Sequence, residues 1–125
     1  MKSLDNEERA ELLLKRYGFR FDTIIREEIR NLLINEIEHY VSGSSEYIRV
    51  LCGYLFCIGN IEDLELLKKA KYNINFDVGC MIDLEWIENI DVSNKKYKVR
   101  RTKLIADFVD YYKTYFNLRY NLQNL

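Results

Sequence analysis

Residues 46–90, EYIRVLCGYLFCIGNIEDLELLKKAKYNINFDVGCMIDLEWIENI, carry the densest helical pattern in the chain. Apolar residues recur there every three or four positions, which places them on one helical face that another element must cover. Gly59 follows the last periodic residue and is suited to end this helix, because glycine adopts left-handed backbone conformations without strain. Asn60 and Asp63 form a variant of the N-terminal capping box. The pattern therefore predicts one helix up to Gly59 and a second beginning near Ile61.

The rest of this block predicts two further features. The second helix carries an apolar stripe on Leu64, Leu67 and Ala70, and residues 72–76 then interrupt the pattern. Asp77 is an N-cap candidate for a third helix. The apolar positions of that helix are Met81, Ile82, Leu84 and Trp86. We therefore expect three short helices packed in series.

Two phrases of the block, GNIEDLELLKKAK (59–71) and NFDVGCMIDLEWI (75–87), resemble a segment of small helical immunity proteins from bacterial polymorphic toxin and contact-dependent growth inhibition systems. The matching residues are Gly59, Glu62, Asp63, Ala70, Lys71, Phe76, Asp77, Cys80, Ile82 and Asp83. The chain has Lys68 and Lys69 where that family carries a tryptophan before Ala-Lys, and it lacks the family's Gly-Ala-Gly after the third helix. The resemblance implies a cytoplasmic protein that binds and blocks one toxin domain.

The segments before and after residues 46–90 are also predicted to be helical. Asp5 and Glu8 form a capping box for a helix that ends at Gly18. Asp22 is an N-cap candidate for a helical stripe of about five turns that reaches Val41. The chain from about residue 94 to 117 predicts one long last helix, with fraying in the final residues.

Length and composition favour a single all-α domain. The 125 residues are enough for one hydrophobic core, and the chain has no proline and only five glycines to break helices. We expect residues 1–125 to form a compact bundle of about six helices with antiparallel helical hairpins. No apolar run approaches the roughly 20 residues of a membrane-spanning helix. The charged N-terminus lacks a secretory signal, and the three cysteines suit buried reduced thiols, so the expected location is the cytoplasm.

The chemistry-bearing residues predict a binding protein without cofactor or metal. His39 is the single histidine and lies near the end of a helix, where a cation interacts favourably with the helix dipole. Cys52 and Cys57 lie about 140 degrees apart around a helix, so they cannot share one metal ion. No nucleophile elbow, phosphate-binding glycine loop or zinc-binding helix motif is present. We therefore expect no enzymatic activity.

Charge divides the chain into an acidic segment and a basic one. Residues 60–91 hold eight acidic residues and three lysines, and the balance reverses from Val92 onward. Such asymmetry steers charged partners, although two opposite segments can also neutralise each other. The basic run 95–103, KKYKVRRTK, suggests an alternative function as a nucleic-acid-binding helical module, in which Tyr97 would stack on a base. No recognisable nucleic-acid-binding motif accompanies this run.

The favoured interpretation is an immunity protein whose acidic surface blocks the active site or substrate groove of a cognate toxin C-terminal domain. A nuclease is the expected toxin class, since a nuclease must present a cationic surface to phosphate. The predicted toxin-binding residues are Glu62, Asp63, Tyr72, Asn73, Asp77, Asp83, Glu85, Trp86 and Glu88. Tyr72, Asn73 and Trp86 are candidate anchors, although a place in the core is the favoured interpretation of Trp86. Tyr111 and Tyr120 are aromatic residues left over from the core face of the last helix.

Overall fold

The computed structural model describes residues 5–43 and 45–117, and these form an all-α bundle. Its α-helices are α1 (Asn6–Tyr17), α2 (Arg26–Glu38), α3 (Ser45–Ile58), α4 (Leu64–Tyr72), α5 (Phe76–Met81), α6 (Leu84–Glu88) and α7 (Lys98–Tyr115). Two short 3-10 helices, η1 (Ile61–Asp63) and η2 (Lys95–Tyr97), precede α4 and α7. Within the described residues no strand is present, which confirms the predicted fold class. No helix of this part of the chain combines the length and apolar character needed to cross a membrane.

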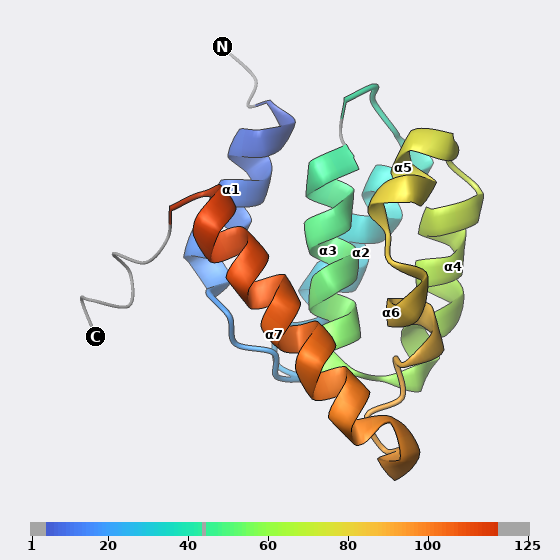
Figure 1. Ribbon diagram of the computed structural model, residues 1–125. Coiled ribbons are helices and arrows are strands. Elements are labelled where there is room, and N and C mark those ends of the chain that lie inside the picture. Colours follow the sequence, from blue (N-terminus) through green and yellow to red (C-terminus); the bar gives the residue numbers. More distant parts are fainter. Residues whose placement is uncertain (1–4, 44, 118–125) are drawn as a thin grey trace.

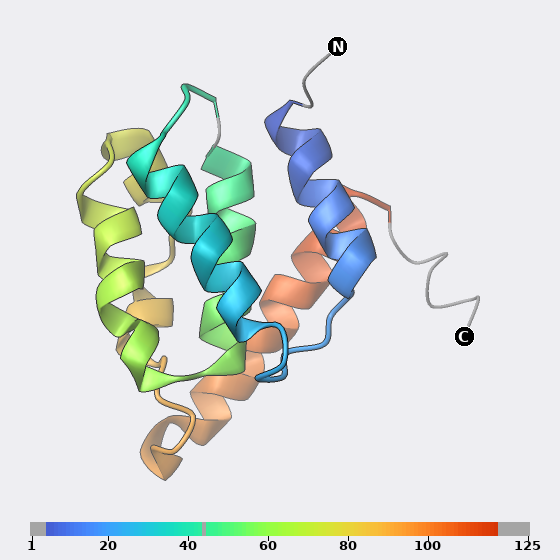
Figure 2. The same cartoon turned by 180° about the vertical axis from the view of Figure 1, so that it is seen from behind.

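Helix α3 is the centre of the bundle. Its residues from Glu46 to Ile58 are buried with the exception of Arg49, so the other helices cover it on nearly all sides. Helices α2, α3 and α4 stand side by side with alternating directions, and α7 crosses the bundle obliquely (Figures 1 and 2). The connections from α2 to α3 and from α3 to α4 are short, which makes the expected antiparallel hairpins.

A cluster of aromatic rings joins α3 to α7. Phe108 makes edge-to-face contacts with Tyr54, Trp86 and Tyr112 at centroid distances of 6.2, 5.7 and 5.1 Å. Such pairs add to the stabilisation that burial of the rings already gives. A Cβ atom at Gly53 would lie only 2.1 Å from a ring carbon of Phe108. Glycine at this position therefore allows α7 to pack closely against α3.

The local signals that predicted helix ends are confirmed. Asp5 accepts a hydrogen bond from the Glu8 backbone N–H at 2.8 Å and begins α1. Gly59 has a φ of 82 degrees and ends α3, and Asn60 accepts from the Glu62 N–H at 2.9 Å. These caps form because each side chain reaches a backbone group within three residues.

The single third helix expected after residue 76 is wrong, because the segment forms two helices, α5 and α6. Asn75, and not Asp77, caps α5, and Asp83 caps α6 through the Glu85 N–H. Between them the extended backbone of Ile82 turns its side chain into the core. The Lys71 ammonium donates to the carbonyl of Gly79 at 2.6 Å and to that of Ile82, which fixes the end of α5.

Three smaller expectations also need correction or fall outside the described residues. The second helix is shorter than predicted and begins at Arg26, because Asp22 accepts from the Ile24 N–H and caps a turn before the helix. Cys52 and Cys57 are buried as expected, whereas Cys80 is exposed. The predicted fraying of the last residues and the leftover Tyr120 lie outside the described residues.

Candidate functional site

Two aromatic side chains stand exposed where α4 meets α5. Tyr72 ends α4 with 61% of its surface exposed, and Phe76 begins α5 with 82% exposed. Asn75 places Phe76 in the first turn by capping the helix with its own side chain, and the apolar side of α5 is taken by the buried Val78. We call Tyr72 and Phe76 the aromatic ridge.

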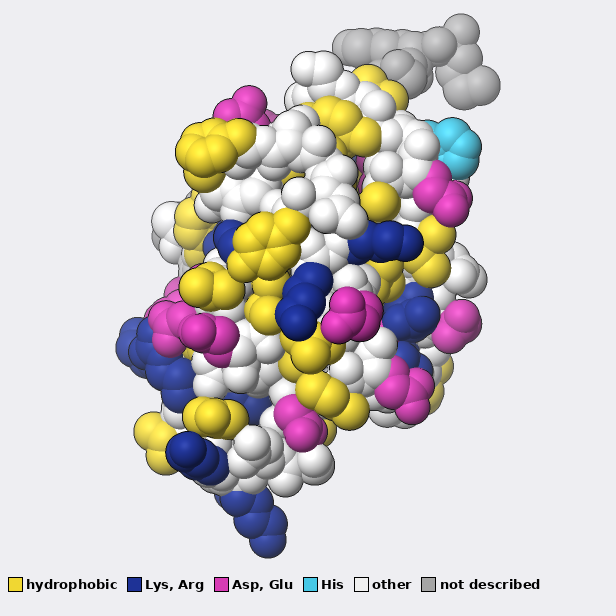
Figure 3. All heavy atoms as spheres, turned by 90° about the vertical axis from the view of Figure 1, so that its right-hand side faces the viewer, with side chains coloured by type: hydrophobic (Ala, Val, Ile, Leu, Met, Phe, Trp, Pro, Cys, Tyr) yellow, Lys and Arg dark blue, Asp and Glu magenta, His cyan; other side chains and the backbone are white. Residues whose placement is uncertain are grey.

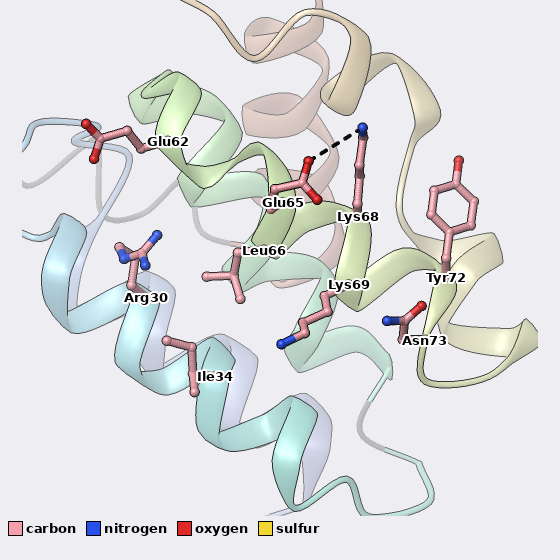
Figure 4. A pocket seen from close by; sticks show the side chains of 9 residues that line it. All are labelled: Arg30, Ile34, Glu62, Glu65, Leu66, Lys68, Lys69, Tyr72 and Asn73. Atoms are coloured by element: carbon pink, nitrogen blue, oxygen red, sulfur yellow. Dashed lines mark ion pairs between the residues drawn. The ribbon is translucent and has the colours of Figure 1, made fainter.

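A groove of about 540 Å³ between α2 and α4 flanks the ridge on one side. Ile34 of α2 and Leu66 of α4 face each other across it and form its apolar floor (Figure 4). Glu62 lies near one end of this groove, and Tyr72 and Asn73 lie at the other. The groove thus offers an apolar centre with polar ends, which is the usual composition of a protein recognition site.

The rim of this α2–α4 groove carries both signs of charge. Lys68 and Glu65 form an exposed ion pair at 3.8 Å, drawn as a dashed line in Figure 4, and Lys69 extends toward α2. The wider face seen in Figure 3 likewise alternates acidic, basic and apolar side chains. A uniformly acidic surface, as the sequence suggested, is therefore not what this face presents.

A second hollow of about 430 Å³ lies on the other side of the ridge. Most of its wall is apolar, and the residues that line it are Lys71, Tyr72, Asn75, Phe76, Gly79 and Cys80. Tyr72 lines both hollows and Phe76 lines only the second, so Tyr72 separates the α2–α4 groove from the apolar hollow. An exposed aromatic pair that borders two hollows is a candidate anchor for a protein partner.

Of the predicted acidic residues, four lie at the surface, although Glu62 also pairs with Arg26 at 3.8 Å and Asp83 caps α6. The four are Glu62, Asp77, Asp83 and Glu88. Glu85 instead accepts two hydrogen bonds from the guanidinium of Arg100, one of them 2.6 Å long from Nε, and this contact lowers the pKa of the Glu85 carboxyl. Part of the acidic segment is thus neutralised by the basic segment.

Two predicted site residues are not at the surface, and their assignment to it is wrong. Asp63 is 0% exposed and accepts two 2.9 Å hydrogen bonds from Arg26 and another from Arg30, which ties η1 to α2. Trp86 is 2% exposed and stacks on Phe56 at a centroid distance of 5.9 Å, so it is a core residue. The predicted anchors that remain accessible are Tyr72 and Asn73.

Sequence analysis did not single out Phe76 as a site residue. A phenylalanine at the start of a helix is normally assigned to the core, and its exposure follows from Asn75 acting as the cap. Had the cap been placed at Asn75, Phe76 and Val78 would have fallen on different sides of α5, about 200 degrees apart. That spacing is the signal that identifies Phe76 as a surface residue.

Three of the six cations in the basic run 95–103 are engaged within the protein. Arg101 is buried and donates to the carbonyls of Asn89 at 2.6 Å, Ile90 and Phe56 at 3.1 Å and Cys57 at 3.4 Å. Burial lowers the pKa of this guanidinium. Arg100 pairs with Glu85 and Lys103 pairs with Asp107 at 2.7 Å. This leaves Lys95, Lys96 and Lys98 as its exposed cations without a carboxylate partner in the described residues.

Structural roles account for His39 and for the two buried cysteines, Cys52 and Cys57. His39 follows the last residue of α2, with its Nδ1 3.2 Å from the Asn35 carbonyl oxygen. Burial raises the pKa of the Cys52 and Cys57 thiols, which keeps them protonated and unreactive. In residues 5–43 and 45–117 no three His, Cys, Asp or Glu side chains gather as a potential metal site.

Comparisons with models of known protein families, with curated proteins and with solved structures found no significant match.

Proposed function

We propose that this protein is an immunity protein that binds and neutralises a cognate bacterial toxin domain by covering its active site or substrate groove. The observation that carries the proposal is the exposed aromatic ridge, in which Tyr72 lies between the α2–α4 groove and the apolar hollow and Phe76 lines that hollow. The resemblance of residues 59–87 to immunity proteins supplies the kind of partner.

The ridge has the properties of an interface centre. Large aromatic side chains dominate the binding energy of protein interfaces when a partner desolvates them, and polar residues form the surrounding rim. Leaving a phenylalanine 82% exposed contributes nothing to folding, since apolar surface stabilises only when it leaves water. A partner that covers Phe76 recovers that free energy on binding.

The segment 60–91 leaves exposed acidic residues that favour a basic partner surface, and one of them, Asp77, lies next to the ridge. Glu62 lies on the groove, Asp77 follows Phe76 in α5, and Asp83 and Glu88 lie at the two ends of α6. Negative charges at a rim increase the rate of association with a cationic surface more than they increase affinity. A nuclease domain presents such a surface because it binds phosphate, so a nuclease acting in the cytoplasm is the toxin class that we propose.

Co-expression tests this proposal directly. The toxin candidate is the C-terminal domain encoded by the reading frame next to this gene, produced with and without this protein in a sensitive cell. We expect the domain alone to stop growth, and we expect this protein to restore growth and to co-purify with the domain. Growth arrest that this protein does not relieve would refute the proposal.

Binding to nucleic acid is the competing outcome. The alternative module would use the run 95–103, and it predicts binding to DNA or RNA that weakens steeply with salt. The internal contacts of Arg100, Arg101 and Lys103 reduce the cations of this run without such contacts from six to three. Binding of a short duplex that is lost on substitution of Lys95, Lys96 and Lys98 would favour the alternative.

A further inference from the structure

A third hollow, separate from the aromatic ridge, contains an arginine surrounded by aromatic rings. The hollow has a volume of about 430 Å³ and lies between α3, α5, α6 and α7. The residues that form its walls include Arg49, Lys71, Met81, Asp83, Leu84 and Tyr111. We propose that this Arg49 pocket receives the carboxylate of an acidic side chain from a protein partner.

The guanidinium of Arg49 is held in place before any ligand arrives. Its central carbon lies 5.0 Å from the Trp86 ring centroid, 4.7 Å from Tyr111 and 5.2 Å from Tyr112. Cation–π contacts on several rings restrict the side chain and reduce the entropy that binding would otherwise cost. Arg49 is also the one residue of α3 between Glu46 and Ile58 that is not buried.

Most hydrogen-bond donors of this guanidinium have no acceptor within the described residues. Its NH1 donates to the Tyr112 hydroxyl at 2.7 Å, and that hydroxyl in turn donates to Glu46. A guanidinium carries five N–H groups in a rigid fork, so donors remain for a second planar acceptor. A carboxylate matches that fork in a bidentate geometry.

Two cations and two carboxylates lie near the pocket. Lys71 is engaged with the backbone carbonyls at the end of α5, and its charge adds to that of Arg49. Asp83 lines the pocket, and Glu46 accepts from the Tyr112 hydroxyl. A dianion is attracted more strongly by the two cations and repelled more strongly by the two carboxylates, so these charges alone do not separate a phosphate from a carboxylate, and a phosphate probe decides between them.

The apolar walls favour a side chain from a protein over a free small acid. Met81 and Leu84 flank the charged group, and Leu84 is itself exposed. A residue next to the acidic one in a partner would cover this apolar surface. This inference holds for any protein partner and goes beyond the proposed function, because it does not require that the partner be a toxin.

The test uses the full chain and the NMR signal of the Arg49 side-chain Nε–H. Capped glutamate is the first probe, and capped glutamine is its neutral control of nearly the same shape. We expect a saturable shift with glutamate at low salt and none with glutamine. An equal response to both probes, or no saturable response to glutamate, would overturn the proposal.

Two variants separate recognition from folding. Arg49→Lys keeps the charge and loses the fork, and we expect at least a tenfold loss of glutamate affinity, read from the backbone amide shifts of Met81 and Leu84. Asp83→Asn keeps the cap of α6, since asparagine also caps helices, and removes one repelling charge. We expect it to tighten glutamate binding about threefold. An unchanged affinity in Asp83→Asn would contradict the placement of the ligand beside Asp83.

Two further probes identify the source and type of the anion. A capped Leu-Glu-Leu tripeptide should bind more tightly than acetate if a protein side chain is the occupant, since its leucines reach the apolar walls. Equal affinities would overturn the assignment to a protein partner. Stronger binding of inorganic phosphate than of acetate would overturn the assignment to a carboxylate.

Discussion

The acidic segment 60–91 and the basic run 95–103 use their charges differently. In the basic run both arginines are bound within the protein, and Arg101 is buried among four backbone carbonyls. In the acidic segment only Asp63 is fully buried, and most of the other acids remain at the surface. The two arginines tie the basic run to other parts of the bundle, whereas the acidic segment keeps most of its acids exposed and includes the aromatic ridge that we propose binds a partner.

The role of Arg101 follows from helix chemistry. The last carbonyls of a helix have no partner within it, and Phe56 and Cys57 lie at the end of α3 while Asn89 and Ile90 follow α6. One guanidinium with five donors satisfies carbonyls at both helix ends, and a cation is favourable there. Gly59 leaves room for it, since a Cβ atom there would lie 2.8 Å from Arg101 NH2.

Of the substitutions that test this comparison, one at Arg101 should reduce the free energy of unfolding most. Arg101→Met keeps much of the side-chain volume but leaves several buried carbonyls without a donor, and we expect a loss of about 3 kcal/mol or more in the free energy of unfolding. Urea denaturation followed by circular dichroism measures this loss. Lys98→Met, an exposed change in the same run, is the matched control and should stay within about 0.5 kcal/mol. Equal effects of both variants would mean that the run is not structural.

In the acidic segment, Asp63 is the buried charge that corresponds to Arg101. Its substitution should cause the second-largest loss of stability. Asp63→Asn removes the negative charge that Arg26 and Arg30 share, and we expect a loss of about 2 kcal/mol in the free energy of unfolding. The neighbouring Glu62→Gln changes a largely exposed carboxylate and should stay within about 0.5 kcal/mol. An equal loss of stability in Glu62→Gln and Asp63→Asn would contradict the distinction between the buried and the surface acid.

The contact between the two segments, Glu85 with Arg100, should have the smallest effect on stability, because both side chains are exposed to water and salt. Hydrogen bonding to Arg100 lowers the pKa of Glu85, so the ionised carboxylate stabilises the folded state above its unfolded pKa of about 4.3. This contribution is lost as the pH falls through the lowered pKa. Glu85→Gln should therefore be slightly less stable than the parent at pH 7, with the difference disappearing in acid.

Urea midpoints of the two proteins between neutral and acid pH measure this difference. A difference that stays constant over that range would show that the charge of Glu85 is not its cause. Added salt should also reduce the difference at neutral pH, since exposed ion pairs are screened.

The features that sequence predicted well depend on neighbouring residues. The fold class follows from periodicity and the absence of proline, and the ends of α1 and α3 follow from Asp5, Gly18 and Gly59. Each of these signals acts within one helical turn, where spacing alone determines which groups meet. The division into an acidic and a basic segment was also predictable, because it follows from counting the charged residues along the sequence.

The features that sequence missed depend on residues far apart in the chain. Asp63 is buried because Arg26 and Arg30, 37 and 33 residues earlier, reach it from α2. The division of the third helix into α5 and α6 depends on Lys71, which lies on another helix and binds Gly79 and Ile82. Periodicity holds no information on such contacts. The exposure of Phe76, in contrast, follows from a local signal, the neighbouring Asn75 cap, which the assignment of the cap to Asp77 missed.

The affinity of the cognate toxin domain for variants of the aromatic ridge tests the central claim most directly. Phe76→Ala and Tyr72→Ala should each weaken binding about 30-fold, equivalent to about 2 kcal/mol, and should leave the urea midpoint unchanged. Val99→Ala is the matched control, because Val99 is an equally exposed apolar residue, 85% accessible, on α7. Calorimetry that finds the loss in the ridge variants alone would agree with the proposal. Ridge variants that bind as tightly as Val99→Ala would contradict it.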